Sequence, residues 1–152
     1  MGRRNTYKGK FKPINPKKYK GNLDNIVFRS LWERQVMKQF DEHPSVISWG
    51  SESFPIPYLF EVDGKVHDYW PDFVVEILED SGKIVKYIVE VKPYAETIAP
   101  VPGKKRSKTY TDQVLTWLKN SAKWKEAEKF CQKNGMKFIK LTEVEIFGKK
   151  KI

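Results

Sequence analysis

The sequence has little cysteine, little histidine and no long apolar run. Cys131 is the single cysteine among 152 residues, which excludes an internal disulfide and a cysteine-based zinc site. The two histidines, His43 and His67, lack zinc-ligand spacing, and His43 is more simply read as the end of a helix before Pro44. No apolar stretch of about 18 residues is present, so neither a transmembrane helix nor a secretory signal behind the basic N-terminus is expected. A hydrophobic content of 39% and an aromatic content of 14% instead indicate one globular domain.

Acidic residues are also missing from the N-terminal segment. Residues 1–20 contain eight Lys or Arg and no Asp or Glu, whereas the remaining 132 residues contain 21 basic and 19 acidic residues, so most of the net charge of +10 lies at this end. Basic segments with interleaved aromatics suit phosphate backbones, and the alternative is a solvated tail that aids solubility. We therefore predict a basic, flexible N-terminal arm over residues 1–24, a folded domain over 25–147 and a basic C-terminal tail over 148–152. The expected DNA contacts are Arg3, Arg4, Lys8, Lys10, Lys12, Lys17 and Lys18 in the arm, and Lys104, Lys105, Arg106 and Lys108 in a later loop.

Residues 71–92 are typical of a β-hairpin. Two runs rich in β-branched and aromatic residues flank Asp80-Ser81-Gly82, which suits a three-residue turn with a left-handed glycine. If Ser81 is the centre of the turn, apolar residues face apolar residues along the two strands, and Glu76 faces Lys86. A slip of one residue would lose this match, so the sequence predicts the register as well as the hairpin.

The same register brings two carboxylates together at the open end of the hairpin. Asp72 falls opposite Glu90, with Cβ atoms roughly 5 Å apart, and Lys92 points to the same side two residues further on. Facing like charges destabilise a sheet, and a hard divalent cation with oxygen ligands would remove the conflict. The structural alternative is a cross-strand carboxylate pair with Lys92 as a salt-bridge partner.

Helical spacing of apolar residues predicts an amphipathic helix over residues 28–42. Ser30-Leu31-Trp32-Glu33 matches a capping box, so the helix is expected to begin after Ser30. Glu33 then has two interpretations that stay open: it bonds back to the backbone as a cap, or it projects from the first helical turn into a nearby site.

The rest of the chain alternates between strands and one long helix. Residues 43–50 are interpreted as a connection, residues 52–62 as an edge strand interrupted by two prolines, and the next strand as starting near Val66. Residues 93–108 are expected to be a loop, which either grips DNA or is an ordinary surface loop. Residues 111–134 are interpreted as one long helix or two in succession, ended by Gly135, with Trp117 and Trp124 off the centre of its core stripe and a strand from Met136 to Leu141. The order α-β-β-β-α-β predicts an α/β (α+β) domain with a mixed sheet flanked by helices.

This order and these motifs resemble a known nuclease superfamily. Pro71-Asp72 and Glu90-Val91-Lys92, with Glu33 on the preceding helix, resemble the PD-(D/E)XK pattern. The opening Met-Gly-Arg-Arg-Asn, the run over residues 15–21 and the segment 29–33 are similar to the head completion nucleases of T4-type bacteriophages. The endonuclease subunit of Tn7-like transposons is similar over a shorter core.

The resemblance implies a restriction-endonuclease-like fold and metal-dependent hydrolysis of DNA in phage head completion. It implies a catalytic set of Glu33, Asp72, Glu90, Lys92 and Gln113, with Mg²⁺, or Mn²⁺ in its place, bound by Asp72, Glu90 and the Val91 carbonyl. Double-stranded DNA is the implied substrate, phage head or neck proteins are candidate partners, and the implied location is the host cytoplasm or the virion. Neither a membrane nor a nucleotide cofactor is expected. The alternatives are a non-catalytic DNA-end-binding or head–tail assembly protein with this fold, and a transposon-type nuclease that needs a partner subunit.

Overall fold

A four-stranded mixed sheet forms the centre of the computed structural model, which describes residues 7–101 and 108–148. The sheet order is β3-β6-β7-β8, and it is built from β3 (Val46–Ser51), β6 (Phe73–Leu78), β7 (Ile84–Val91) and β8 (Lys137–Leu141). Strands β7 and β8 pair in parallel, whereas the other neighbours in this sheet are antiparallel, and the helix α2 (Lys108–Asn134) carries the chain between β7 and β8. A parallel pair requires such a crossover connection.

The hairpin of β6 and β7 has the predicted register. The ladder runs from Leu78 opposite Ile84 to Phe73 opposite Val89, with Glu76 facing Lys86. Gly82 closes the turn at φ +86°, a left-handed conformation that suits glycine. The apolar and charge matching visible in the sequence was therefore enough to define this pairing.

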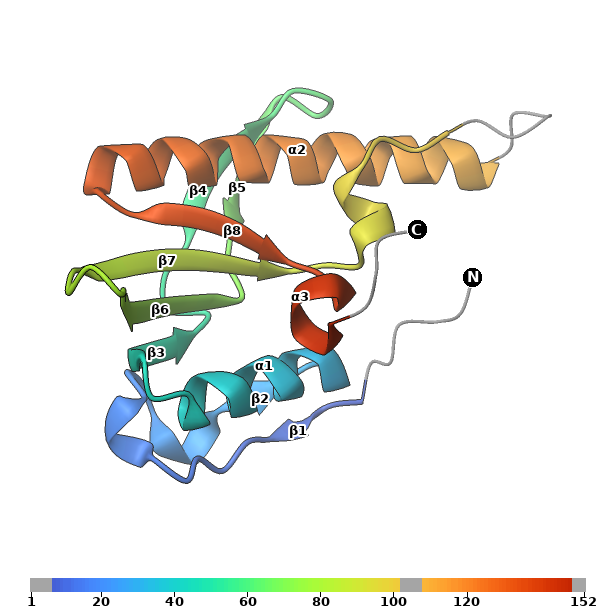
Figure 1. The fold of residues 1–152 in the computed structure, drawn as a ribbon. Coiled ribbons are helices and arrows are strands. Elements are labelled where there is room, and N and C mark those ends of the chain that lie inside the picture. The colour runs from blue at the N-terminus through green and yellow to red at the C-terminus, as the bar shows by residue number, and fades with distance from the viewer. Residues whose placement is uncertain (1–6, 102–107, 149–152) are drawn as a thin grey trace.

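The sheet separates two apolar layers, because successive side chains of a strand point to opposite faces. Phe73, Val75 and Val89 pack on one face against α1 (Leu31–Glu42), together with the short helix α3 (Glu143–Phe147). Ile88 packs on the opposite face with Trp124 of α2. Figure 1 shows α1 and α2 on opposite sides of the sheet, which is the predicted restriction-endonuclease-like arrangement.

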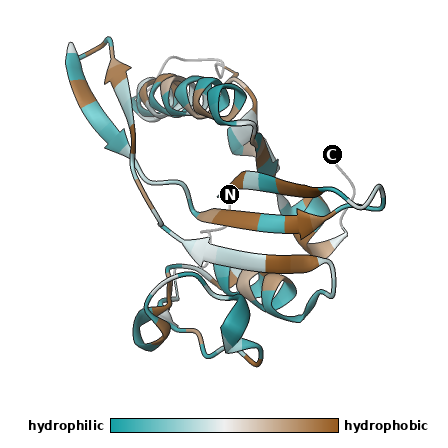
Figure 2. Cartoon of the chain, turned by 90° about the vertical axis from the view of Figure 1, so that its left-hand side faces the viewer, coloured by the Kyte–Doolittle hydropathy of each residue, from teal (hydrophilic) through white to brown (hydrophobic). Residues whose placement is uncertain are grey.

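A separate two-stranded hairpin, β4 (Ile56–Phe60) with β5 (Lys65–Tyr69), lies on the α2 side of the sheet. Pro57 lies within β4, and among the described strands β4 pairs only with β5, as expected for a strand that carries proline. Ile56, Tyr58 and Tyr69 bury their side chains in the same core layer as Trp124. Figure 2 shows this hairpin beside α2 and apart from the central sheet.

Several details of the elements differ from the sequence-based prediction. Residues 46–51 are not a connection but the edge strand β3, whose Trp49 is 1% exposed at the centre of the α1 core. For residues 111–134 the first alternative, one long helix, is confirmed, and this helix begins earlier, at Lys108. Its apolar stripe differs, however, because Trp124 is buried whereas Leu115 and Leu118 are exposed. The helix α3 was not predicted at all. Strand β3 was missed because Ser48, Gly50 and Ser51 weaken the apolar alternation that indicates a strand.

The N-terminal segment is more ordered than predicted over the residues that the structure describes. Residues 7–30 include β1 (Gly9–Lys10), β2 (Val27–Phe28) and two short 3-10 turns, Pro16–Lys18 and Leu23–Asn25. The rings of Phe11 and Tyr19 lie edge-on against Trp49, and Asp41 accepts the backbone N–H groups of Ile14 and Asn15 at 2.7 and 2.9 Å. Aromatic packing and a buried carboxylate thus hold residues 7–24 against α1 and β3. The division of the chain at residues 24 and 147 stays a prediction.

Candidate active site

The candidate site lies where β6 begins and β7 ends. Asp72 directly precedes β6, and its Oδ2 accepts the backbone N–H of Val91 at 2.7 Å. Glu90, the penultimate residue of β7, is 5% exposed, and its carboxylate lies close enough for its charge to act on the Asp72 carboxyl group. Extending the observed ladder by one residue puts these two positions opposite each other, so the hairpin register alone brings the carboxylates together.

Glu90 is held by an aromatic residue on each side. The Tyr69 hydroxyl at the end of β5 donates to Glu90 Oε1 at 2.9 Å, and the indole N–H of Trp124 lies 3.4 Å from Oε2. Lys92 Nζ lies 4.0 Å from the same Oε2, with the lysine side chain 19% exposed. Buried carboxylates require such partners, and here they come from the separate hairpin, from α2 and from the end of β7.

The pKa of the Asp72 carboxyl is raised well above its ordinary value. Loss of water around it is the largest cause, followed by the negative charges of Glu90 and Glu33, while the Val91 N–H partly opposes the shift. Burial and like charge both disfavour the ionised form of an acid. A buried carboxyl group whose pKa is strongly shifted by a neighbouring charge is typical of a functional site, because ordinary packing would not retain this conflict.

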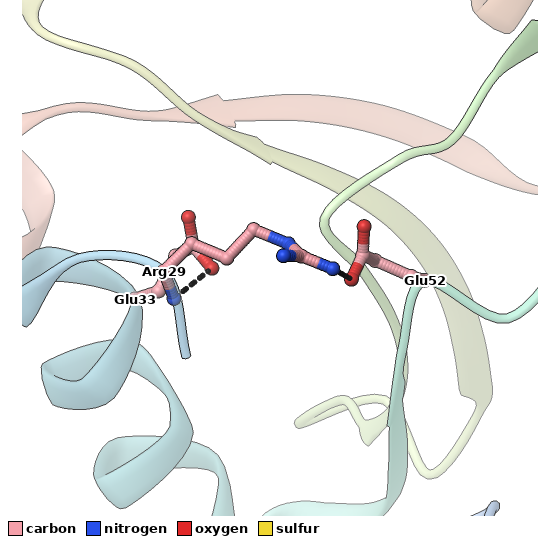
Figure 3. Close-up of polar contacts among 3 residues, drawn as sticks. All are labelled: Arg29, Glu33 and Glu52. Atoms are coloured by element: carbon pink, nitrogen blue, oxygen red, sulfur yellow. Dashed lines mark hydrogen bonds and ion pairs between the residues drawn. The ribbon is translucent and has the colours of Figure 1, made fainter. Parts of the chain in front are cut away.

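Glu33 acts as a helix cap and as a neighbour of this site. Ser30 Oγ accepts the Glu33 N–H at 3.1 Å, and Glu33 Oε1 accepts the backbone N–H of Arg29 at 3.2 Å, not that of Ser30. The Arg29 guanidinium reaches in the other direction to Glu52, at 3.0 Å (Figure 3). Because the Glu33 charge still raises the pKa of Asp72, the capping role and the electrostatic role coexist.

Glu52 belongs to these surroundings too, although nothing in the sequence indicated it. Its backbone has φ +45°, a left-handed conformation that residues other than glycine rarely adopt, and its N–H donates to the Asp72 carbonyl at 3.1 Å. Backbone strain of this kind tends to persist where surrounding contacts enforce it. Glu52 thus ties the end of β3 to the residue that precedes β6.

Lys123 on α2 is a second site residue that the sequence did not reveal. Its half-buried ammonium lies 5.8 Å from the centre of the Tyr69 ring, and burial lowers its pKa, an effect opposed by the charge of Glu90. Lys140 of β8 lies over the Trp124 ring at 4.3 Å. Lys123 directly precedes Trp124 in the sequence, but only the docking of α2 on the sheet brings its side chain close to the carboxylates.

Gln113 does not join the carboxylates. It is exposed on α2 and lines a pocket between this helix and the segment after β7, which contains the 3-10 turn Tyr94–Thr97. Among the predicted DNA contacts, Lys8, Lys10, Lys12, Lys17 and Lys108 are exposed, while the ammonium of the less exposed Lys18 donates to the His43 carbonyl at 2.8 Å. Arg3, Arg4, Lys104, Lys105 and Arg106 lie outside the described residues.

The oxygen donors at this site suit a hard cation whose coordination is completed by water and substrate, and they do not form a site made of protein ligands alone. Within residues 7–101 and 108–148, no three His, Cys, Asp or Glu side chains are grouped to hold a metal ion. Two carboxylates with a nearby backbone are nevertheless what Mg²⁺ uses when water and substrate phosphate complete its coordination. Across the same residues, no helix has the length and apolar character needed to cross a bilayer.

The sequence matches a known family of endonuclease domains. The model of the TnsA-like endonuclease N-terminal domain matches residues 43–143, more than half of the chain. This protein belongs to that endonuclease family. The family match includes Asp72, Glu90 and Lys92 and begins after Glu33, so it spans the sheet that carries the carboxylates.

A curated relative extends the similarity to nearly the whole chain. The head completion nuclease of Enterobacteria phage T4 is 37% identical over 144 residues, which cover 90% of this chain and 91% of the relative. The two endonuclease resemblances noted in the sequence are thereby confirmed. Because this alignment covers 90% of the chain, it extends beyond the family match at residues 43–143.

Proposed function

We propose that this protein is a metal-dependent DNA endonuclease that hydrolyses phosphodiester bonds during phage head completion. The observation that carries the proposal is the contact between Asp72 and Glu90 with Lys92 beside them, at the end of a hairpin in an endonuclease fold. We infer the PD-(D/E)XK type of site from the same three residues. Magnesium is the proposed cofactor, and manganese is expected to replace it.

The two carboxylates are the proposed metal ligands, and the Val91 carbonyl is the third. Val91 donates its N–H to Asp72, so its backbone already lies beside one of the two acids. When bound, Mg²⁺ supplies Lewis-acid polarisation of the phosphate and a more acidic water. Tyr69 and Trp124 orient Glu90 in the way that outer hydrogen bonds orient metal ligands.

The lysines deal with the charge that develops during hydrolysis. As water attacks phosphorus and the bond to one nucleoside oxygen breaks, negative charge builds on the phosphate oxygens. Lys92, next to Glu90, orients the attacking water or neutralises this charge. The Lys123 ammonium interacts electrostatically with the charges of Glu90, Asp72 and Lys92. It therefore adds positive potential beside the two carboxylates.

The biological setting follows from the relative and not from the site. The T4 relative is named a head completion nuclease, and the similarity covers nearly all of both chains. We therefore propose action on double-stranded DNA in the host cytoplasm during assembly, with phage head or neck proteins as partners.

The test is plasmid cleavage by the purified protein in magnesium, in manganese and in EDTA. We expect nicking or linearisation that requires metal and falls by at least about a hundredfold in Asp72→Ala, Glu90→Ala and Lys92→Ala. The matched control is Glu61→Ala, an exposed acid in the turn between β4 and β5. Normal cutting by Asp72→Ala or Lys92→Ala would contradict the site. No cutting in any metal would favour an assembly protein that binds DNA ends, or a nuclease that needs a partner subunit.

A further inference from the structure

A second concave site lies next to the carboxylates, between α2 and the segment that follows β7. It has a volume of about 480 Å³, within the range of ligand pockets in proteins. Ile98, Pro100 and Trp117 give it apolar walls, and Asp112, Gln113 and Asn120 add polar groups. A pocket of this composition suits a flat, partly polar ring better than it suits a phosphate.

Asn120 is the polar group that points most directly to a ligand. It is 5% exposed, the residue lines the pocket, and its side-chain amide is the least exposed of the polar groups there. An amide offers two N–H donors and one acceptor oxygen. A ligand with complementary donors and acceptors can pair with this amide at the pocket wall.

The pocket and the carboxylates are linked through α2 and through the chain that leaves β7. Trp117 packs edge-on against Trp124, with ring centres 6.3 Å apart, and Trp124 contacts Glu90. Along the chain, Lys92 is followed directly by Pro93 and by the 3-10 turn that leads into the pocket wall. The wall of the pocket thus follows closely along the chain from the end of β7 that carries Lys92.

We propose that the pocket binds an unpaired nucleobase of the DNA strand that is cut. This rests on the proposed nuclease function and gives it a substrate preference for DNA with an unstacked base near the scissile phosphate. The base lies against Trp117, while the amides of Asn120 and Gln113 bond its edge. Asp112 suits the exocyclic amino group of cytosine or adenine, because a carboxylate only accepts hydrogen bonds.

The charges around the pocket favour a nucleobase over a peptide or a second phosphate. Asp112 and Glu96 both line it, and their negative charge would repel a phosphate inside the pocket. Positive charge lies instead at Lys92 and Lys123, on the side of the carboxylates. The positively charged region therefore suits the phosphate of a nucleotide, and the neighbouring pocket suits its base.

The experiment compares two short duplexes of the same sequence, one with a single unpaired cytosine and one with an abasic residue at that position. Binding is measured by fluorescence anisotropy in EDTA, so that neither strand is cut. We expect the wild-type protein to bind the cytosine duplex roughly tenfold more tightly, the order of effect that stacking of one base supplies. Asn120→Ala and Gln113→Ala should reduce this ratio toward one without weakening binding of the abasic duplex.

Gln132→Ala is the control, because Gln132 is exposed on the same helix far from the pocket, and it should keep the wild-type ratio. Alanine favours helix, so Asn120→Ala should retain the fold, which its melting temperature checks. Equal binding of the two duplexes by the wild type, or an unchanged ratio in Asn120→Ala, overturns the proposal and would leave the pocket to a protein segment. Metal-dependent cutting of plasmid with no base preference would count against this pocket alone. A base preference without any cutting would count against the nuclease function alone.

Discussion

Asp72 is the residue at which stability and function conflict most clearly. In metal-free buffer its folded-state pKa lies above that of the unfolded chain, because water is lost and Glu90 and Glu33 are close. The folded state therefore holds the proton more tightly, and stability falls as the pH rises from about 4 through the raised pKa.

Asp72→Asn should remove this loss, since the amide stays neutral and its oxygen can still accept the Val91 N–H. We expect a higher melting temperature than wild type at pH 8 in EDTA, by about 2 to 4 °C for each kcal/mol gained, and no gain near pH 4. Calorimetry at the two pH values measures the difference. An equal shift at both would mean that the charge of Asp72 is not the cause.

Glu33 allows its two roles to be separated at one position. Glu33→Gln keeps an oxygen that can accept the Arg29 N–H but removes the charge that acts on Asp72. We expect unfolding free energy within about 0.5 kcal/mol of wild type, and cleavage reduced roughly 10- to 100-fold, as for residues that act through a metal ligand. Glu33→Ala should lose both the acceptor for the Arg29 N–H and the charge that acts on Asp72, so stability and cleavage should both fall. Full activity in Glu33→Gln would leave Glu33 as a cap only.

At the scale of elements, β3 shows how one strand joins the N-terminal segment to the site. The Trp49 carbonyl accepts the Lys20 N–H at 2.8 Å, and a Cβ at Gly50 would lie 2.9 Å from the Lys20 carbonyl oxygen. Backbone atoms at this distance leave no room for a side chain. The strand ends at Ser51, and the next residue, Glu52, donates its N–H to the Asp72 carbonyl.

Gly50→Ala should therefore destabilise the protein by about 1 to 3 kcal/mol, the usual cost of overpacking. Unfolding in urea measures the loss, and hydrogen exchange should show faster exchange of the Lys20 amide. The control is Gly64→Ala, where a Cβ meets nothing within 4 Å and only the cost of a positive φ remains. Equal losses in both variants would mean that close approach is not what requires glycine at position 50.

For the whole molecule, the arrangement of charge decides how DNA is approached. Lys8, Lys10, Lys12 and Lys17 are exposed on a segment that is otherwise held to the core by Phe11 and Tyr19. Deleting this segment would remove core packing together with charge. Replacing its lysines keeps the packing and tests the charge alone.

The quadruple Lys→Gln variant at positions 8, 10, 12 and 17 should bind DNA more weakly with a smaller salt dependence. The slope of log K against log salt should fall by about 0.9 for each phosphate that the protein no longer neutralises. The control replaces Lys83, Lys86, Lys133 and Lys137, which are exposed at the other end of the strands from Glu90. A similar fall in both variants would show that only net charge matters.

Much of the central chemistry was readable from local sequence. Apolar and charge matching across Ser81 defined the hairpin register, and the register alone set Asp72 opposite Glu90 with Lys92 beside them. Ser30 and Gly135 likewise marked the start of α1 and the end of α2, because caps act through neighbouring backbone groups. Pairing and capping are local, so the sequence by itself determined them.

Tertiary structure decided what surrounds that centre. Tyr69, Trp124 and Lys123 reach Glu90 or its neighbours only because the β4–β5 hairpin and α2 dock on the same face of the sheet. The same docking leaves Gln113 in a separate pocket, and the packing of Phe11 and Tyr19 on Trp49 orders a segment whose composition suggested flexibility. These contacts join residues far apart in the chain, and their free energy comes from burial that no single stretch of sequence displays.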